Sequence, residues 1–170
     1  MSREFKQKTK MKKIILTIVA LSAYGFANAQ DLKYGVRGGI DMVSVSAGGG
    51  SESLTGFFAG AFAEYSLSDK IVLQPGFSYH TASKDGYKSD YISIPALAKY
   101  KVADKINAIG GLALFYNMDS AVKTDKLRFN LEIGGSYDIT ENIFIDPRYS
   151  LGLNGEAKVN HLLLGIGYKF

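Results

Sequence analysis

The most constraining feature of the chain is a two-residue alternation of side-chain character that recurs along residues 34–170. In each alternating segment one set of positions is apolar and uncharged, while the opposite set holds small, polar and charged residues. Successive side chains of a β-strand point to opposite faces of its sheet. The pattern therefore predicts eight strands with one apolar and one polar face, over residues 34–42, 57–65, 71–79, 92–100, 106–116, 127–137, 143–153 and 162–170.

The polar face carries ten charged residues, six positive and four negative. Unpaired charges are very costly in a water-free interior, whereas opposite charges that face each other can be accommodated. An apolar exterior around such an interior is stable in lipid, provided that closure pairs every backbone group. We therefore predict an all-β fold, an eight-stranded antiparallel up-and-down transmembrane β-barrel. Its predicted lumen charge network is Lys33, Arg37, Asp41, Glu64, Lys99, Arg128, Glu132, Asp146, Arg148 and Lys169.

Four tyrosines that end apolar runs divide the chain into two-strand units. Tyr65, Tyr100, Tyr137 and Tyr168 are 35, 37 and 31 residues apart. A finer repeat relates residues 69–75 to 141–147, and the equivalent Pro75 and Pro147 predict local β-bulges. Short turns are expected at 68–70, 103–105 and 140–142, and longer loops at the other end, over Ala47–Ser53, Thr81–Asp90, Met118–Lys126 and Asn154–Asn160.

Aromatic residues gather at the two ends of the apolar face. Such clustering is typical of the belts that mark both lipid interfaces of a membrane barrel. The predicted belts are Tyr34, Tyr65, Tyr100, Tyr137, Tyr168 and Phe170 at the turn end, and Phe57, Tyr79 and Tyr116 at the loop end. The final alternation resembles the C-terminal signal by which bacterial outer-membrane barrels are recognised for assembly, and comprises Leu162, Leu164, Ile166, Tyr168 and Phe170.

The first 29 residues have the layout of a secretory signal peptide. A basic stretch ends at Lys13, an apolar run follows to about Phe26, and Ala27 and Ala29 form an A-x-A cleavage site. The mature barrel domain is then residues 30–170, beginning at Gln30. Translation from Met11 in place of Met1 would also give a complete signal. The alternative, a membrane anchor helix, needs about 20 apolar residues, which this run lacks.

Charge and cysteine content exclude several functions. The chain carries 20 Lys and Arg against 16 Asp and Glu, but the basic excess lies in the predicted signal peptide. The mature part is nearly neutral, which removes the basic footprint of a nucleic-acid-binding protein. With no cysteine, disulfides, thiolate metal sites and thiol catalysis are excluded.

At the level of motifs, the mature chain resembles the small porin-like outer-membrane β-barrel proteins of Bacteroidota, which include PorT-like proteins and share the eight-stranded form of OmpA and OmpX. The resemblance rests on the opening Gly35–Asp41, on Leu73–Pro75, on Tyr91–Tyr100 and on the terminal aromatic. The family often has an acidic residue where Gly76 and Ser93 stand here. The resemblance implies a fold and an outer-membrane location, and an association of relatives with type IX secretion.

The polar face offers little for catalysis or metal binding. His80 and His161 both lie toward the loop end, but a metal site wants three or four ligands, so we expect hydrogen-bonded lumen histidines. Ser78 and His80 share a face, yet Glu64 is predicted nearer the opposite rim, which argues against a hydrolase triad. Paired glycines such as Gly134 and Gly135 are expected to leave room for inward arginines. No catalytic residue, cofactor or metal is predicted.

Eight strands give a lumen that side chains just fill. We therefore expect a non-enzymatic, plugged barrel that acts as a membrane-embedded scaffold, presenting short extracellular loops. Its expected partners are outer-membrane lipid, the barrel-assembly machinery and envelope or secretion proteins, with no nucleic acid, and we expect a monomer. A narrow channel for small solutes is the first alternative. The second is a soluble periplasmic lipocalin-like barrel, in which the apolar face surrounds a ligand.

Overall fold

A computed structural model describes residues 32–119 and 126–170, and the predicted signal peptide with its cleavage site lies outside them. The described residues form eight strands: β1 (Leu32–Ala47), β2 (Gly50–Ser66), β3 (Ile71–Lys84), β4 (Tyr87–Ala103), β5 (Ile106–Asn117), β6 (Leu127–Asp138), β7 (Ile143–Gly152) and β8 (Lys158–Lys169). They close into one barrel in sequence order. The predicted fold class is confirmed. Among the described residues no helix is long and apolar enough to cross a membrane.

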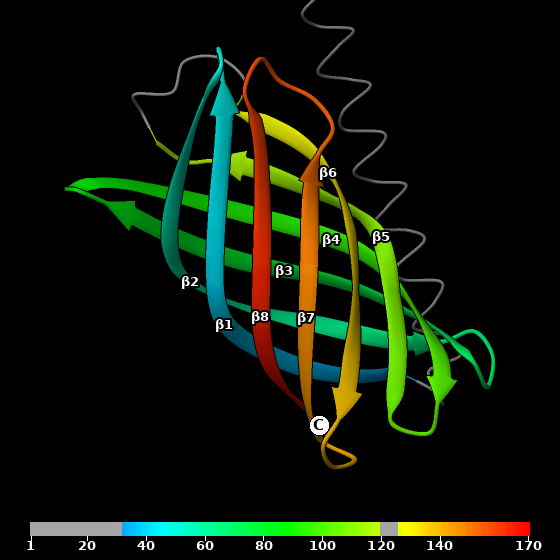
Figure 1. Ribbon diagram of the computed structural model, residues 1–170. Coiled ribbons are helices and arrows are strands. Elements are labelled where there is room, and N and C mark those ends of the chain that lie inside the picture. Colours follow the sequence, from blue (N-terminus) through cyan, green and yellow to red (C-terminus); the bar gives the residue numbers. More distant parts are fainter. Residues whose placement is uncertain (1–31, 120–125) are drawn as a thin grey trace, which may run out of the picture. The chain divides into compact units, whose positions relative to one another are not determined.

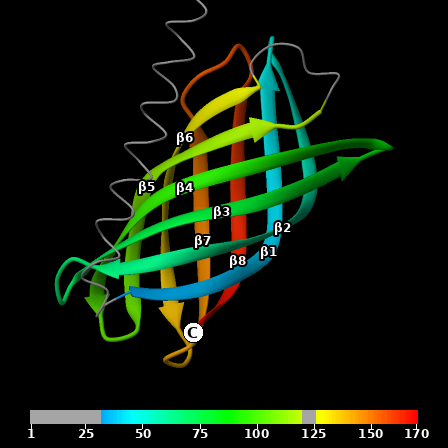
Figure 2. The same ribbon diagram turned by 180° about the vertical axis from the view of Figure 1, so that it is seen from behind.

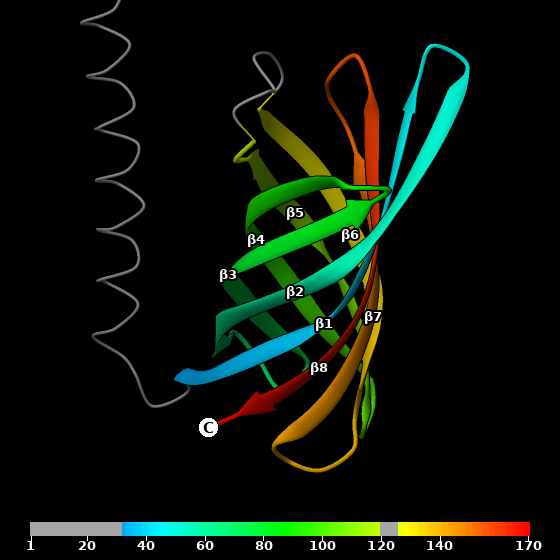
Figure 3. The same ribbon diagram turned by 90° about the vertical axis from the view of Figure 1, so that its left-hand side faces the viewer.

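The strands are strongly tilted, as closure of a barrel requires. In Figure 1, β1, β8 and β7 form the near wall while β3 and β4 cross behind them. Figure 2 shows the same crossing from the other side. We call the end that holds residues 67–70, 104–105 and 139–142 the turn end, and the opposite end the loop end. In Figure 3 the β1–β2 hairpin extends outward at the loop end.

The first and last strands close the wall. Their antiparallel register runs from Gly35 opposite Lys169 to Ser46 opposite Lys158. The Phe170 amide then donates to the Tyr34 carbonyl at 2.8 Å, which extends the closure by one bond. On its other edge β8 pairs with β7, from Ile143 opposite Tyr168 onward. The C-terminal strand is thus paired along both edges.

The apolar face points outward in all eight described strands. Two neighbouring leucines of β8 show the contrast, since Leu163 is 1% exposed in the lumen and Leu164 is 42% exposed on the wall. The buried set contains charged and amide side chains, including Asp41, Asn130 and Arg148. A lipocalin-like barrel requires the opposite orientation, with its apolar face inside, so the structure contradicts that alternative.

Two of the four predicted long loops are in fact tight hairpins. β1 and β2 are joined by Gly48 and Gly49 alone, and β3 and β4 by Asp85 and Gly86. All four residues have positive φ, as a type I′ turn requires, and Gly-Gly and Asp-Gly are favoured there. The flanking polar residues extend the strands instead of leaving them. The polar residues beyond the apolar band therefore belong to the strands, and the predicted loops over Ala47–Ser53 and Thr81–Asp90 are wrong.

The predicted bulges at Pro75 and Pro147 are wrong. Pro75 stays in register opposite Ala96, and Pro147 opposite Leu164. Instead, the β2–β3 and β6–β7 ladders each skip two positions beside the proline while the register on either side is unchanged. Proline lacks only its own N–H, so a local gap suffices and no extra residue is needed. A register shift does occur between Lys101 and Ala103.

The 69–75 and 141–147 repeat corresponds to one turn built twice. Ser68 Oγ accepts from the amides of Lys70 and Ile71, and Thr140 Oγ1 accepts from the amides at 142 and 143. A hydroxyl that replaces a backbone acceptor in this way stabilises a tight turn. Two hairpins of the turn end are thus fixed by the same local chemistry.

Candidate functional site

The barrel interior gathers the polar residues and is the candidate site. Within the described residues, seven charged side chains are buried, three cations and four anions: Arg37, Asp41, Glu64, Lys99, Glu132, Asp146 and Arg148. They fall into two groups at different depths. We call the group formed by Asp41, His80 and His161 the loop-side triad. We call the group nearer the turn end the turn-side network; it consists of Arg37, Glu64, Gln74, Lys99, Asn107, Glu132, Ser136, Asp138, Asp146, Arg148 and Lys169.

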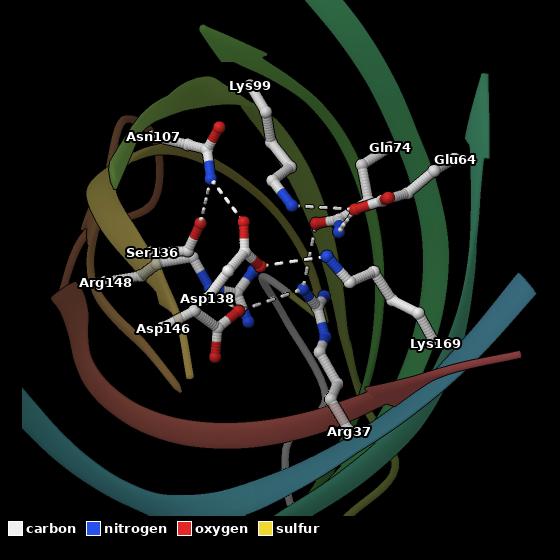
Figure 4. Close-up of polar contacts among 10 residues, drawn as sticks. All are labelled: Arg37, Glu64, Gln74, Lys99, Asn107, Ser136, Asp138, Asp146, Arg148 and Lys169. Carbon is white, nitrogen blue, oxygen red and sulfur yellow. Dashed lines mark hydrogen bonds and ion pairs between the residues drawn. The ribbon is translucent and has the colours of Figure 1, made fainter. Parts of the chain in front are cut away.

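Glu64 holds one part of the turn-side network. Its Oε1 accepts from Lys99 Nζ at 2.7 Å and from Gln74 Nε2 at 3.0 Å. The other end of the Gln74 amide accepts from Arg37 Nη1 at 3.4 Å. Figure 4 shows these side chains converging on the lumen from β1, β2, β3 and β4. A buried carboxylate is thereby paired with an ammonium group and an amide.

Two arginines and two carboxylates form the second part. Arg148 Nη1 donates to Glu132 Oε2 at 2.9 Å, and Arg148 Nε lies 3.2 Å from Asp146 Oδ2. Arg37 Nη1 lies 3.6 Å from the same Asp146 oxygen. The Asp146 oxygens have no hydrogen bond of good geometry among the described residues. The arginines therefore hold Asp146 by charge, without directional bonds.

A third part lies closest to the turn end. Asp138 accepts from Lys169 Nζ at 2.8 Å and from Asn107 Nδ2 at 3.2 Å, and Asn107 also donates to Ser136 at 3.2 Å. The Lys169 and Lys99 ammonium groups lie 5.6 and 5.3 Å from the ring centre of Phe144. Both distances are within the range of cation–π attraction.

The loop-side triad has a different construction. The Nδ1 atom of His80 lies 2.8 Å from Asp41 Oδ2, and that of His161 lies 3.1 Å from both Asp41 oxygens. His80 Nε2 contacts Ser93 Oγ at 2.9 Å. The His161 ring stacks on Phe115 at a centroid distance of 4.5 Å. All three triad side chains are buried.

From the triad toward the loop end, the interior is first lined by apolar side chains and then widens into a cavity. Val43, Leu54, Ala82 and Val159 pack into a buried cluster. A cavity of about 450 Å³ lies at the loop end, and its lining includes Lys84, Tyr91, Asn117 and Arg128. Tyr91 also contacts the edge of the His161 ring, with centroids 5.8 Å apart. The cavity and the triad are therefore neighbours, with Tyr91 between them.

Three of the ten charged residues predicted for the lumen lie outside the fully buried set. Lys169 is half-buried and belongs to the turn-side network. Arg128 is half-buried at the loop end, where it donates to the carbonyls of Ala157 and Asn154. Lys33 is exposed, because it precedes Gly35, where the β1–β8 pairing begins. A residue beyond the paired wall has no lumen to face.

The predicted aromatic belts lie in two rows on the outer face. At the turn end Tyr100, Tyr137 and Tyr168 stand opposite the first residues of β3, β5 and β7. At the loop end Tyr79 pairs with Ile92, which pairs with Tyr116. The remaining members are Tyr34 beside Phe170, Tyr65 opposite Leu73, and Phe57 opposite Thr81 near the loop-end row.

The residues weighed for a hydrolase do not meet. Glu64 bonds Lys99 and Gln74, while His80 bonds Asp41 and Ser93. Ser78 Oγ has no hydrogen-bond partner among the described residues. A nucleophile must lie within reach of its base, so these residues form no catalytic triad.

Sequence reasoning missed the partners of the two histidines. It placed Asp41 in the lumen but did not bring it to His80 and His161, which are 39 and 120 residues away. It also missed Asp138, which holds Lys169. The alternation gives the face of a residue but not its depth relative to a distant strand. Relative depth follows from the pairing registers of the strands that lie between two residues, and no local pattern reports it.

Comparisons with known proteins agree with this architecture. The family model described as an outer membrane protein β-barrel domain matches residues 14–170. Curated protein sequences yield no significant match.

Several solved structures share the fold at low sequence identity. The attachment invasion locus protein Ail of Yersinia pestis aligns with a TM-score of 0.59 and 16% identity, over 83% of this chain and 100% of that one. Neisserial surface protein A gives 0.57 and 19%, over 81% and 97%. A de novo designed transmembrane β-barrel gives 0.54 and 17%, over 81% and 95%. At these identities the likeness shows the fold alone.

Proposed function

Because the chain belongs to the outer membrane protein β-barrel domain family, we propose that it is a non-enzymatic scaffold embedded in the outer membrane, with a plugged lumen. Its loop end presents hairpins and loops to other envelope molecules. The observation that carries this proposal is the turn-side network. Side chains from all parts of the wall meet there, including Arg37 of β1, Lys99 of β4, Glu132 of β6 and Arg148 of β7.

The ion pairs make the plug an integral part of the fold. Passage of a solute would have to separate Lys99 from Glu64 or Arg148 from Glu132, at 2.7 and 2.9 Å. Removing one partner of a buried pair costs about 3–5 kcal/mol. A transient opening of that cost is rare, which favours a scaffold over a pore.

Conductance of the purified protein tests the plug. We expect full-length protein, reconstituted in planar bilayers and shown folded by heat-modifiable gel mobility, to give no single-channel current. The double variant Glu132→Ala and Arg148→Ala, which removes one buried ion pair and leaves Asp146 its contact with Arg37 at 3.6 Å, is the positive comparison and should conduct once its gel mobility shows that it is folded. Steady unitary currents from the unaltered protein would refute the plug.

A narrow channel is the second candidate, and the loop-end cavity favours it. That cavity of about 450 Å³ is lined by Lys84 and Arg128 as well as Glu52 and Asp85, so it could admit water and small solutes of either charge. The same bilayer recordings distinguish the candidates. A current that disappears when the loop-end cavity is narrowed by Val45→Phe would support the channel.

We further propose that the outward aromatic rows anchor the barrel in outer-membrane lipid, and that the end of β8 serves recognition by the barrel-assembly machinery. Export would follow from the signal peptide cleaved before Gln30. Membrane fractionation tests the location, and recovery in the osmotic-shock fluid without detergent would contradict it. A link to PorT-like proteins of Bacteroidota, and to secretion partners, belongs to the same proposal. Co-purification after crosslinking at the loop end tests that link.

A further inference from the structure

The loop-side triad joins three groups that are ordinary ligands of transition metals. Asp41 comes from β1, His80 from β3 and His161 from β8. One ligand atom of each lies within 4.8 Å of the others. We propose that these three residues form a buried binding site for a divalent transition-metal ion of the Zn²⁺ class. This goes beyond the proposed scaffold function and does not depend on it.

The spacing of the ligand atoms suits a tetrahedral ion. With bonds of about 2.0–2.1 Å to nitrogen and oxygen, neighbouring ligands of tetrahedral zinc are about 3.3 Å apart. The two imidazole nitrogens lie 2.8 and 3.1 Å from the nearest oxygens of Asp41. An outward shift of a few tenths of an ångström would therefore bring both Asp41–imidazole separations to the value for neighbouring zinc ligands, and all three ligand atoms already lie within 4.8 Å of one another. A fourth position is left for water or another donor.

Charge balance supports a cation at this point. Every buried carboxylate of the turn-side network has a Lys or Arg partner, as in the pairs of Glu64 with Lys99 and Glu132 with Arg148. Asp41 is completely buried, and within the described residues its ion-pair partners are His80 and His161. An uncompensated buried charge is costly. A bound divalent ion would supply positive charge at this point with both histidines neutral.

The surrounding residues fix the ligands in place. Ser93 Oγ holds the far nitrogen of His80 at 2.9 Å, so that Nδ1 faces Asp41. His80 also packs between Phe58 and Phe115, and His161 stacks on Phe115. Outer groups that orient metal-binding histidines are worth about 10- to 100-fold in metal affinity. The triad is thus held in one arrangement before any ion arrives.

The composition of the chain makes a metal-binding titration specific for this site. His80 and His161 are its two histidines and it has no cysteine, so any imidazole-dependent binding reports this site, provided that no histidine tag is present. Full-length protein is purified in detergent, treated with a chelator and titrated with Zn²⁺ by calorimetry. Co²⁺ then serves as a second probe, because its visible absorption reports tetrahedral coordination.

We expect saturable binding of one Zn²⁺ per chain and a tetrahedral Co²⁺ spectrum. Asp41→Asn, His80→Gln and His161→Gln should each abolish saturation. Ser93→Ala should weaken affinity about 10- to 100-fold. Glu141→Gln, an exposed carboxyl at the turn end, is the control and should bind as the unaltered protein does. Absence of saturable binding, or equal affinity in His161→Gln, would overturn the site.

One measurement needs no variant, in case the substituted barrels do not fold. X-ray absorption of the Zn²⁺-loaded unaltered protein should show two imidazole ligands in a four-coordinate shell. A shell of oxygen atoms alone would place the ion on surface carboxylates and refute the proposal. Zn²⁺ should also raise the temperature at which gel mobility changes, since a ligand that binds only the folded state stabilises it.

Discussion

The two halves of the lumen neutralise their carboxylates in different ways. In the turn-side network Glu64, Glu132 and Asp146 face lysine or arginine side chains. In the loop-side triad Asp41 faces two histidines instead. In one half the carboxylates are paired with Lys or Arg, while in the other the carboxylate has imidazole partners and belongs to the proposed metal site.

This difference assigns separate tasks to the two depths. The turn-side network is suited to closure of the lumen, because each buried carboxylate there faces a lysine or arginine side chain. The loop-side triad lies beside the open cavity through Tyr91, which brings the adjustable group nearer to the exterior. The proposed plug and the proposed metal site thus occupy one small barrel without sharing side chains.

The largest expected effect comes from removing an arginine of the plug. Arg148→Met leaves Glu132 and Asp146 short of a cation in a buried site, which should cost about 3–5 kcal/mol of unfolding free energy. Arg128→Met, on the same lumen face but half-buried at the loop end, loses hydrogen bonds to backbone carbonyls and should cost about 1 kcal/mol. Urea unfolding in lipid vesicles measures both.

Equal losses of unfolding free energy in Arg148→Met and Arg128→Met would show that burial in the turn-side network does not make an arginine more important for stability. A further variant sharpens it: adding Glu132→Gln to Arg148→Met takes away one stranded charge. The double variant should therefore be more stable than Arg148→Met alone. If Glu132→Gln lowers the unfolding free energy by the same amount in the Arg148→Met background as it does alone, the two side chains are not coupled.

The second prediction tests whether the turn-side network lies at the depth of hydrocarbon. Leu131 faces outward directly beside the inward Glu132 on β6. Leu131→Arg should destabilise the folded barrel by about 2–4 kcal/mol, whereas Tyr137→Arg at the turn-end row should cost about 0–1 kcal/mol. The same vesicle unfolding assay applies. A cost at Leu131 as small as that at Tyr137 would mean that water, not lipid, covers this wall.

A smaller effect is expected from filling space beside Asp146. A Cβ atom at Gly165 would meet Asp146 Oδ1 and lie 3.2 Å from the Phe58 ring, so Gly165→Ala should cost about 1–3 kcal/mol by overpacking. At Gly110 the nearest atom is 3.9 Å away, and Gly110→Ala should be nearly neutral. Indistinguishable unfolding midpoints for the two variants would show that the turn-side network has room to relax.

The face of each strand could be predicted from the sequence because alternation is a local property. Leu162 and Leu164 fall on the wall and His161 and Leu163 in the lumen, as the two-residue period requires. Ion-pair partners could not be predicted in the same way. Lys99 meets Glu64, 35 residues away, because the register of intervening strands brings them to one depth. That register depends on turn geometry and closure, which the alternation does not encode.

The lengths of two hairpin loops were not predicted correctly, for a related reason. Ser83 and Lys88 pair across the Asp85–Gly86 turn, yet their polarity suggested a loop. Polar residues in this barrel mark the end of the apolar band and not the end of the strand. The Asp-Gly pair itself carried the correct information, since it favours a two-residue turn. At this hairpin, turn chemistry therefore indicates the ends of β3 and β4 better than polarity does.

The smallest effect is expected where an ion pair lies in water, at the rim of the loop-end cavity. Lys84 Nζ donates to Glu52 Oε2 at 2.6 Å, and this hydrogen bond lowers the pKa of Glu52 below its ordinary value. A depressed carboxyl pKa stabilises the fold above the unfolded pKa, and that contribution is lost as pH falls through the folded value. Lys84→Met should therefore raise the pKa of Glu52 in a carbon-detected NMR titration. Because both side chains are largely exposed, the unfolding midpoint of Lys84→Met should not move measurably. A loss of unfolding free energy comparable to that of Arg148→Met would show that burial does not make the difference between the two kinds of ion pair.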